Sequence, residues 1–426
     1  MKRGALGSPQ SSHFSSETSS SADSAPLNTP KPSLSKVSLA PPSPLKDKSF
    51  APEVSMLVSM SDTFGGVDED EEEAGGERVH QVTSESIVYP AVQIVKSGSH
   101  AQRYPVWVTE AVAPLAEFIE DVDPQEQFAD LQEIAEGESG SVYAARVVCP
   151  PTAIGLPAGT SHVAIKSIPV PPSSSSPGSV KIQDLAHEMR LLKEVRHEHV
   201  LTMDAIYVDL VDDSVWIRME HMERSLADVI GLVSEGLSLQ ERMIARFASD
   251  VLMALEYLQK QHIAHRDVRS DNLLLNANGI VKLADFSNAI RVSRNAPMCT
   301  GVVGVIYWQA PEMRAGSYNA LKVDVWSLGA TVWELAQTEP PFADVQDSRQ
   351  IGSQWPPLRH PELYSKGFHE FLKLCSRPSS SRPNPNELLN TPFIRNACGR
   401  PVNIQLLSQC RAIEEHVMQR ESAADS

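Results

Sequence analysis

The stretch HRDVRSDNLLLN, residues 265–276, decides which fold this chain is expected to adopt. It carries an aspartate, Asp267, followed five residues later by an amide, Asn272, with Arg269 between them. A carboxylate can accept the proton of an attacking hydroxyl, an amide oxygen can bind a hard cation, and an arginine can hold a phosphate. So short a motif has a meaning only if the rest of the chain supplies partners for these side chains.

A glycine turn upstream offers the first candidate partner. In IAEGESGSV, residues 134–142, Gly137 and Gly140 bracket a turn whose backbone N–H groups can approach phosphates, because glycine has no side chain to clash. A glycine pair alone is more often an ordinary hairpin, so this signal depends on its neighbours.

A lysine and a glutamate form the second candidate. In VAIK, residues 163–166, strand alternation puts Ala164 and Lys166 on one face. Glu188 follows at the border of the apolar stripe of a predicted helix over 182–195, where it can meet Lys166. Most lysines and glutamates at such positions are simply solvated, so the pair matters only in combination with the loop.

The third candidate lies downstream, where Asp285 and Phe286 follow the predicted strand IVKLA. Phosphoryl transfer needs a carboxylate to orient the attacking hydroxyl, oxygen ligands for Mg²⁺, and a cation on the γ-phosphate. Asp267 supplies the first, Asn272 and Asp285 the second, and Arg269 the third. Core packing alone rarely produces these groups in this order.

Residues from about 128 to 394 therefore resemble a eukaryotic protein kinase domain. The sequence pattern is most similar to that of the PAK-like sterile-kinase (STE) group of Ser/Thr kinases. These kinases have VGTPYWMAPE and VDIWSLG where this chain has VGVIYWQAPE (303–312) and VDVWSLG (323–329). The resemblance implies a two-lobed α+β fold, with a small β-rich N-lobe containing one key helix and a larger helical C-lobe. It also implies ATP and Mg²⁺ as cofactors and Ser/Thr hydroxyls of a protein substrate as acceptors.

The resemblance further implies roles for individual residues. Lys166 and Glu188 would form the activating ion pair, Asp324 would anchor the catalytic loop, and Arg382 would pair with Glu312. Met219 would be the gatekeeper, and the hinge would begin at Glu220. ATP is expected to bind at Ile134, Ala135, Gly137, Gly140, Val142, Ala164, Lys166, Glu188, Met219, Glu220, Met222 and Leu274. The expected catalytic residues are Asp267, Lys166, Arg269 and Asn272, and the expected metal ligands are Asn272 and Asp285.

Several positions depart from the family pattern. Arg269 replaces the usual lysine, and Ala135 replaces the first glycine of the nucleotide loop, which many active kinases tolerate. Ser287 replaces the glycine after Asp285 and Phe286, and a serine resists positive φ angles by about 1 kcal/mol. Val305 stands where Ser/Thr kinases place a threonine that hydrogen-bonds the catalytic aspartate, so the aspartate is expected to be held less firmly.

The activation segment also departs from the pattern. Gly301 occupies the position of the activating phosphothreonine in the PAK-like group, which leaves Thr300 and Ser293 as candidate phosphosites for an upstream activating kinase. Arg266 would be the cation that binds such a phosphate.

These departures keep two classes of function open. The first is an active ATP-dependent Ser/Thr protein kinase, because every group that contacts phosphate or metal is present. The second is a pseudokinase or scaffold with weak or no phosphoryl transfer, which Ser287, Val305 and Gly301 motivate. A tyrosine kinase is disfavoured, because IYWQAPE lacks the basic residue that those enzymes tend to place before the tryptophan.

The flanking regions are expected to be simpler. Residues 1–85 are rich in serine, proline and acidic side chains and are predicted to be disordered, with a P-x-x-P-x-K spacing from Pro41 to Lys46 that an SH3 domain accepts. Residues 86–127 are predicted to be a pre-domain segment that packs on the domain edge, with a regulatory docking element as the alternative. The tail, 395–426, is predicted to form a short amphipathic helix through Ile404, Leu407, Ile413 and Val417.

Composition excludes several other classes. The net charge of −17 disfavours nonspecific binding to nucleic acid or to anionic membranes. Five widely separated cysteines define neither a disulfide framework nor a Cys-x-x-Cys metal site. Neither a signal peptide nor a membrane-spanning apolar run is visible, so we expect a cytoplasmic protein, with the nucleus as a second compartment. A Rho-type GTPase partner is unsupported, because residues 1–127 contain no GTPase-binding motif.

Overall fold

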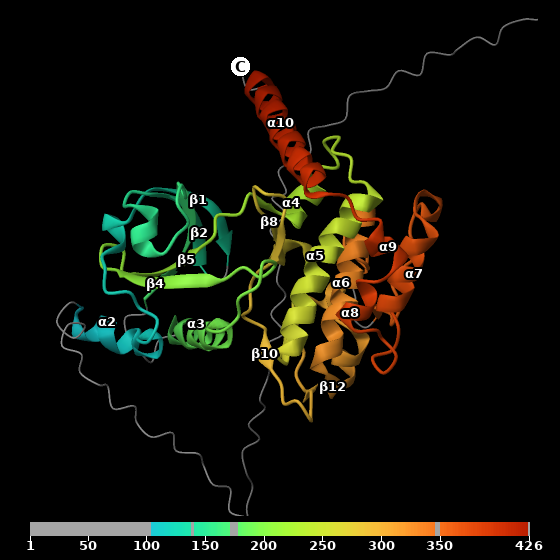
Figure 1. Cartoon of the computed structure of the whole chain (residues 1–426), viewed down its shortest axis with the longest axis horizontal. Helices are drawn as coiled ribbons and strands as arrows, with labels where there is room; N and C mark the ends of the chain where they lie inside the picture. The colour runs from blue at the N-terminus through green and yellow to red at the C-terminus, as the bar shows by residue number, and fades with distance from the viewer. Residues whose placement is uncertain (1–103, 138–139, 171–177, 346–349, 425–426) are drawn as a thin grey trace, which may run out of the picture. The chain divides into compact units, whose positions relative to one another are not determined.

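The computed structural model describes residues 104–137, 140–170, 178–345 and 350–424 (Figure 1). The predicted disordered region, the Pro41–Lys46 motif and residues 86–103 lie outside the described residues, as does the tip of the glycine turn at 138–139.

The N-lobe is built on a five-stranded antiparallel sheet in the order β1-β2-β3-β5-β4. Its strands are β1 (Phe128–Gly137), β2 (Gly140–Val147), β3 (His162–Pro169), β4 (Met203–Asp209) and β5 (Ser214–Met219). Because side chains alternate along a strand, the sheet buries two separate apolar clusters. Helix α3 (Gly178–Leu192) belongs to one of these clusters through the predicted stripe of Ile182, Leu185 and Met189.

The segment before the domain joins the same cluster. Helix α2 (Val106–Ala111) and the 3₁₀ helix η1 (Ala113–Leu115) bury Val108, Val112 and Leu115 beside the apolar side chains of α3. Ile119 then forms a parallel bridge with Ile206 of β4. Residues 104–120 therefore extend the N-lobe core.

The C-lobe is a helical layer around one large apolar cluster. Helix α5 (Glu241–Lys260) contributes the predicted stripe that includes Met243, Phe247 and Val251, all buried. Asn319 begins α6 (Ala320–Gln337) by accepting a hydrogen bond from the Leu321 backbone N–H, as N-caps do. The other helices of this lobe are α4 (Leu226–Gly231), α7 (Lys366–Cys375), α8 (Pro385–Leu388) and α9 (Pro392–Arg395).

Short strands of the C-lobe hold the loops of the site. A three-stranded sheet runs β6 (Arg224–Ser225), β8 (Leu273–Leu275), β9 (Val281–Leu283), and two-stranded pairs join β10 (Ile290–Arg291) with β7 (Ile263–Ala264) and β11 (Met298–Cys299) with β12 (Tyr318–Asn319). The remaining 3₁₀ helices are η2 (Pro124–Glu126), η3 (Pro151–Ile154), η4 (Ser270–Asn272), η5 (Ile306–Trp308), η6 (Pro311–Ala315) and η8 (Pro361–Leu363). Residues 265–276 thus begin directly after β7 and run through η4 and β8.

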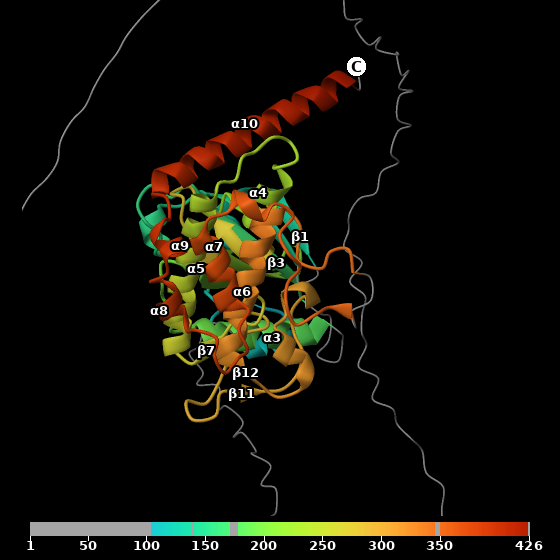
Figure 2. The same cartoon turned by 90° about the vertical axis from the view of Figure 1, so that its right-hand side faces the viewer.

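The C-terminal helix α10 (Arg400–Ala424) is much longer than the short helix predicted, at 25 residues. Its first half packs on the C-lobe and buries Leu406, Leu407 and Cys410, while its second half extends past the body of the domain and keeps contact with it through the Arg420–Glu235 ion pair (Figures 1 and 2). Of the predicted stripe, Leu407 is buried but Ile404 is 42% exposed, because the buried face runs through Leu406, Leu407 and Cys410. None of the helices in the described ranges combines the length and apolarity needed to cross a bilayer.

Candidate active site

The predicted catalytic loop is anchored from the C-lobe core. The backbone N–H groups of His265 and Arg266 donate to the two carboxylate oxygens of Asp324, at 2.8 and 2.7 Å. These bonds hold Arg266 at a φ of +66°, a left-handed conformation that persists only where the surroundings impose it. The predicted anchoring role of Asp324 on α6 is confirmed.

The same loop is joined to the segment after β9 through His265. Its imidazole is fully buried, lies edge-on to the Phe286 ring with centroids 4.7 Å apart, and has Nε2 3.0 Å from the carbonyl oxygen of Ala284. Its other nitrogen, Nδ1, accepts the backbone N–H of Asp267 at 3.3 Å. His265 therefore fixes the spacing between the two segments that carry the predicted catalytic and metal-binding carboxylates.

Asp267 lies within a set of polar contacts. Asn272 donates its Nδ2 to the backbone oxygen of Asp267 at 2.8 Å, which leaves the Asn272 carbonyl oxygen as the atom able to bind a cation. Arg269 places Nε 3.7 Å from Asp267 Oδ1 and donates Nη1 to Asp271 at 2.6 Å. Asn288 donates its Nδ2 to Asp267 Oδ2 at 3.3 Å. The loop thus brings together Asp267, Asn272 and Arg269 as predicted from their spacing.

Asp285 has the properties of a metal-binding carboxylate. Its side chain is exposed, yet the surrounding protein partly desolvates the carboxylate and so raises its pKa. Hydrogen bonds from Ser287 and the positive charge of Lys166 outweigh that effect and hold the pKa of Asp285 below its ordinary value. Asp285 and Asn272 would offer Mg²⁺ two oxygen ligands of the kind that this cation prefers.

The concern about Ser287 is not realised in this conformation. The positive φ angle of this segment, +61°, falls on Asp285, and Ser287 carries none. The serine instead donates its backbone N–H to Asp285 Oδ1 at 3.2 Å. The replacement of glycine therefore adds no backbone strain here and supports the carboxylate.

The predicted ion pair between Lys166 and Glu188 is the part of the site that the structure contradicts. Among the described residues the two side chains form no ion pair within 4.0 Å, and Glu188 Oε1 accepts the backbone N–H of Phe286 at 3.0 Å. Burial raises the pKa of Glu188 to about 7, the Lys166 charge partly opposes that rise, and Asp285 adds to it. Lys166 thus acts electrostatically on both Glu188 and Asp285.

Some of the predicted adenine-binding residues lie together. Met219 and Leu274 pack against the buried cluster of Leu201, Met222 and Ala284. Ala164 of β3 pairs directly with Met219 of β5.

Glu220, in the predicted hinge, has its side chain engaged elsewhere. It accepts Asn276 Nδ2 at 2.9 Å and pairs with Lys282 at 2.5 Å. Only its backbone groups are therefore left to bind a base, and these contacts tie the hinge to β8 and β9.

The glycine turn is confirmed as a hairpin whose geometry requires glycine. Gly137 pairs with Gly140 across β1 and β2, and Ala135 pairs with Val142. Gly140 has a φ of +130°, and an added Cβ would lie 2.3 Å from the Ser167 backbone oxygen. Ile134, also predicted at this site, is about half exposed, at 48%.

The candidate phosphosites Thr300 and Ser293 are both exposed. Arg266, the predicted phosphate-binding cation, donates Nε to the Asn288 backbone oxygen at 2.8 Å and Nη1 to Cys299 Sγ and the Tyr318 hydroxyl, both at 3.4 Å. Its guanidinium therefore contacts Cys299, the residue directly before Thr300. Phosphorylation of Thr300 or Ser293 stays a prediction.

Two supporting residues were missed by the sequence argument. One is Asn288, which contacts Asp267. The other is Glu334 of α6, which is buried and accepts hydrogen bonds from the Ser270 hydroxyl at 2.6 Å and from Trp308 Nε1 at 3.0 Å. Burial raises the pKa of Glu334 to about 7. The available signal was an acidic residue in the second half of α6, within the otherwise uncharged run from Val325 to Gln337.

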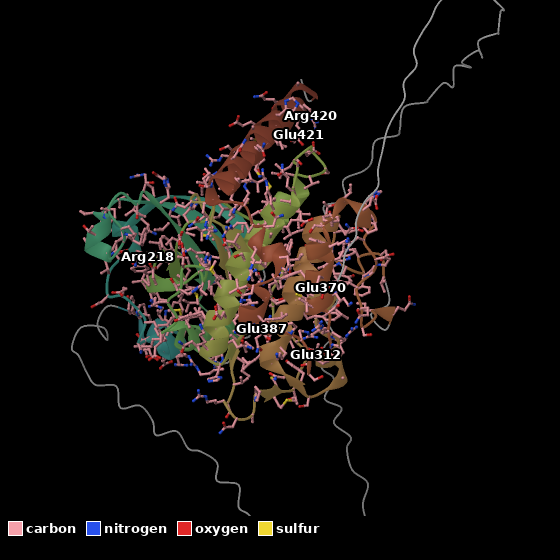
Figure 3. The ribbon with its side chains drawn as sticks, turned by 45° about the vertical axis from the view of Figure 1, so that its right-hand side comes forward. Arg218, Glu312, Glu370, Glu387, Arg420 and Glu421 are labelled. Atoms are coloured by element: carbon pink, nitrogen blue, oxygen red, sulfur yellow. The ribbon has the colours of Figure 1, made fainter. Side chains whose placement is uncertain are left out.

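The ion pair that was predicted within the C-lobe is confirmed. Arg382 is buried and forms two bonds with Glu312, at 2.5 and 3.1 Å, the paired geometry in which a guanidinium matches a carboxylate (Glu312 is labelled in Figure 3). It thereby holds the segment after the activation loop on the helical lobe.

Two lobes joined by a hinge, with this loop and these carboxylates between them, define the class of protein kinase domains. The protein kinase domain family matches residues 128–394, and the chain belongs to that family. It is 31% identical to the Serine/threonine-protein kinase pakA of Dictyostelium discoideum over 75% of this chain and 26% of that protein. It is also 30% identical to pakC of the same organism, over 70% of this chain and 60% of that protein. These relatives confirm the PAK-like resemblance, and the chain spans only part of their length.

Proposed function

We propose that this chain is an ATP- and Mg²⁺-dependent Ser/Thr protein kinase of intracellular signalling, which transfers the γ-phosphate of ATP to hydroxyls of protein substrates. One observation carries the proposal: Asp324 and His265 hold the Asp267 loop at a fixed position relative to Asp285. The curated relatives, named as Ser/Thr kinases, support the same acceptor class.

In this proposal Asp267 orients the attacking hydroxyl and accepts its proton. Its Oδ2 is occupied by Asn288, while Oδ1 accepts no hydrogen bond from any described residue. The free oxygen is thus the one that a substrate hydroxyl would reach. Arg269, 3.7 Å from that oxygen, places a fixed positive charge where the transferred phosphate would lie.

In this proposal the nucleotide and its metal ion would be bound by Lys166, Asp285 and Asn272. Mg²⁺, when bound, would neutralise charge on the phosphates, and Asp285 and Asn272 are the residues that would hold it. The lowered pKa of Asp285 keeps that carboxylate ionised at neutral pH. Lys166, whose charge already acts on Asp285 and Glu188, would bind the α- and β-phosphates.

The test is phosphate transfer by the purified full chain. Labelled ATP, Mg²⁺ and a generic basic protein substrate should yield labelled phosphoserine or phosphothreonine. Asp267→Asn and Lys166→Met should each lower the rate by about 10²-fold or more, because each removes a group that acts on the reacting atoms. No label after pre-treatment with an upstream kinase, or label only on tyrosine, contradicts the proposal.

A pseudokinase or scaffold is the second candidate. The absence of a Lys166–Glu188 ion pair within 4.0 Å in the described part of the chain and the missing hydroxyl at Val305 favour it. Under this alternative, ATP raises the melting temperature of the wild-type chain but no phosphate is transferred. An upstream kinase acting on Thr300 or Ser293, an SH3 partner at Pro41–Lys46 and a cytoplasmic or nuclear location belong to the proposal and not to the observations.

A further inference from the structure

The second half of the activation segment, residues 300–305, approaches Asp267 closely, but none of these described residues gives it a hydrogen bond. A Cβ added to Gly304 would lie 2.7 Å from the Arg266 backbone oxygen and 3.0 Å from Asp267 Oδ1, so the backbone of this segment abuts the carboxylate. The next residue, Val305, has no hydroxyl to donate. Glycine and valine at these two positions therefore offer Asp267 no side-chain hydrogen-bond donor.

A neutral donor reaches Asp267 from the start of the activation segment, just after Phe286. Asn288 donates Nδ2 to Asp267 Oδ2 at 3.3 Å. Its backbone is fixed independently of its side chain, because its carbonyl oxygen accepts Arg266 Nε at 2.8 Å. The neighbouring turn is closed by Ala289 N–H bonding to the Phe286 oxygen at 2.9 Å. The amide is thus presented to Asp267 from a firmly held backbone.

We propose that Asn288 is a positioning residue for Asp267 and replaces the hydroxyl that Val305 lacks. This inference rests on the proposed function, in which Asp267 accepts the proton of the substrate hydroxyl. By occupying Oδ2, the Asn288 amide fixes the rotation of the carboxylate and leaves Oδ1 for the substrate. An amide provides this orientation without adding a charge beside the proton acceptor, whereas Arg269 lies farther away, at 3.7 Å.

The purely structural alternative is that Asn288 only stabilises the turn that follows Phe286. The contact from Arg266 to the Asn288 backbone would survive in Asn288→Ala, since that bond uses the main chain. A structural role therefore predicts little change in turnover, or a loss that accompanies reduced thermal stability. A positioning role predicts a loss of kcat at unchanged stability, and rescue by a hydroxyl placed at residue 305.

The experiment compares five forms of the full chain: wild type, Asn288→Ala, Val305→Thr, the double variant and a control, Asn390→Ala. Asn390 also donates its side-chain amide, to the Asn386 oxygen, but does so far from Asp267 in the C-lobe. For each form, kcat and KM for ATP and for a basic protein substrate are measured with the melting temperature.

We expect Asn288→Ala to lower kcat roughly tenfold, the effect of removing one hydrogen bond to a charged group, with KM for ATP changed less than about twofold. Val305→Thr in that background should restore most of the lost kcat, and Asn390→Ala should match wild type. Unchanged kcat in Asn288→Ala, a loss not rescued by Val305→Thr, or an equal loss in Asn390→Ala overturns the inference alone. An inactive wild type overturns the proposed function and this inference with it.

Discussion

At the scale of single residues, the site combines a carboxylate that stays ionised, Asp285, with a carboxylate whose pKa lies near neutral pH, Glu188. Hydrogen bonds from Ser287 and the charge of Lys166 keep the pKa of Asp285 below its ordinary value. Burial raises the pKa of Glu188 to about 7 from its ordinary 4.5. Lys166 acts on both carboxylates, so the protonation of Glu188 determines how many negative charges share one ammonium group.

The raised pKa of Glu188 predicts a pH dependence of stability. The folded state binds the Glu188 proton more tightly than the unfolded state, so its contribution is fully present below pH 4.5 and is lost as pH rises through about 7. Glu188→Gln removes this loss, since a neutral amide oxygen can still accept the Phe286 N–H. Relative to wild type, Glu188→Gln should gain about 1–3 kcal/mol of unfolding free energy between pH 5 and pH 8. Parallel urea-unfolding profiles for both proteins over that range would contradict the assignment.

Gly140 is the residue at which backbone geometry most directly limits the sequence. Gly140→Ala would place a Cβ 2.3 Å from the Ser167 oxygen at a φ of +130°. We expect it to cost about 2 kcal/mol or more of unfolding free energy and to weaken ATP binding, because β2 and β3, which carries Ser167, must separate to admit the methyl group. Gly231→Ala is the matched control, since no atom lies within 4 Å of its added Cβ. Equal stability of the two variants, measured by urea unfolding, would show that the hairpin tolerates the methyl group.

The residues that sequence reasoning missed share one physical property. Spacing along the chain predicted Asp267, Asn272 and Asp285, because family motifs encode them locally. Asn288 and Glu334 act through contacts with residues 21 and 64 positions away, and only the folded backbone creates such contacts. The Lys166–Glu188 ion pair that the resemblance implied is absent within 4.0 Å in the described residues, where Glu188 instead contacts the backbone of Phe286, 98 positions away.

At the scale of elements, the segment before the family-matched domain supports helix α3. Glu117 accepts Arg190 Nε at 3.3 Å and Lys193 Nζ at 2.9 Å, and Arg190 also donates to the Pro114 oxygen at 2.8 Å. These exposed charged contacts each contribute little, so the apolar cluster around Leu115 holds the segment in place. Periodicity predicted α3 and α5 correctly, but residues 86–127 show no clean period, so their helices were not predicted.

This packing predicts that Leu115 matters for the stability of α3. Leu115 is fully buried in the cluster that contains α3, and Leu115→Ala should cost about 2–4 kcal/mol of unfolding free energy. Val106→Ala, at a position that is 75% exposed in α2, is the control and should cost less than about 0.5 kcal/mol. The measurement is urea unfolding of both variants. A similar cost for both would mean that residues 104–115 do not stabilise the N-lobe.

At the scale of the whole molecule, the chain beyond residue 394 is part of the C-lobe and extends past it. Arg224 pairs with Glu414 at 2.6 Å, and Arg420, labelled in Figure 3, pairs with Glu235 at 3.0 Å. Their carboxylate partners are partly exposed, so burial of Leu406 and Leu407 is the larger contribution to holding α10. The amphipathic pattern predicted a helix here, but its length and its buried face depended on the surface it meets.

The central claim is that this arrangement of loops and carboxylates transfers phosphate to protein hydroxyls. The most direct measurement is the initial rate of labelled phosphate transfer from ATP to serine and threonine of a basic protein, by the full chain and by Asp267→Asn. The account predicts transfer by the wild type and a rate lower by about 10²-fold or more in the variant, with the melting temperature of the variant unchanged. Equal rates in the two proteins, or no transfer by either after treatment with an upstream kinase, would contradict it.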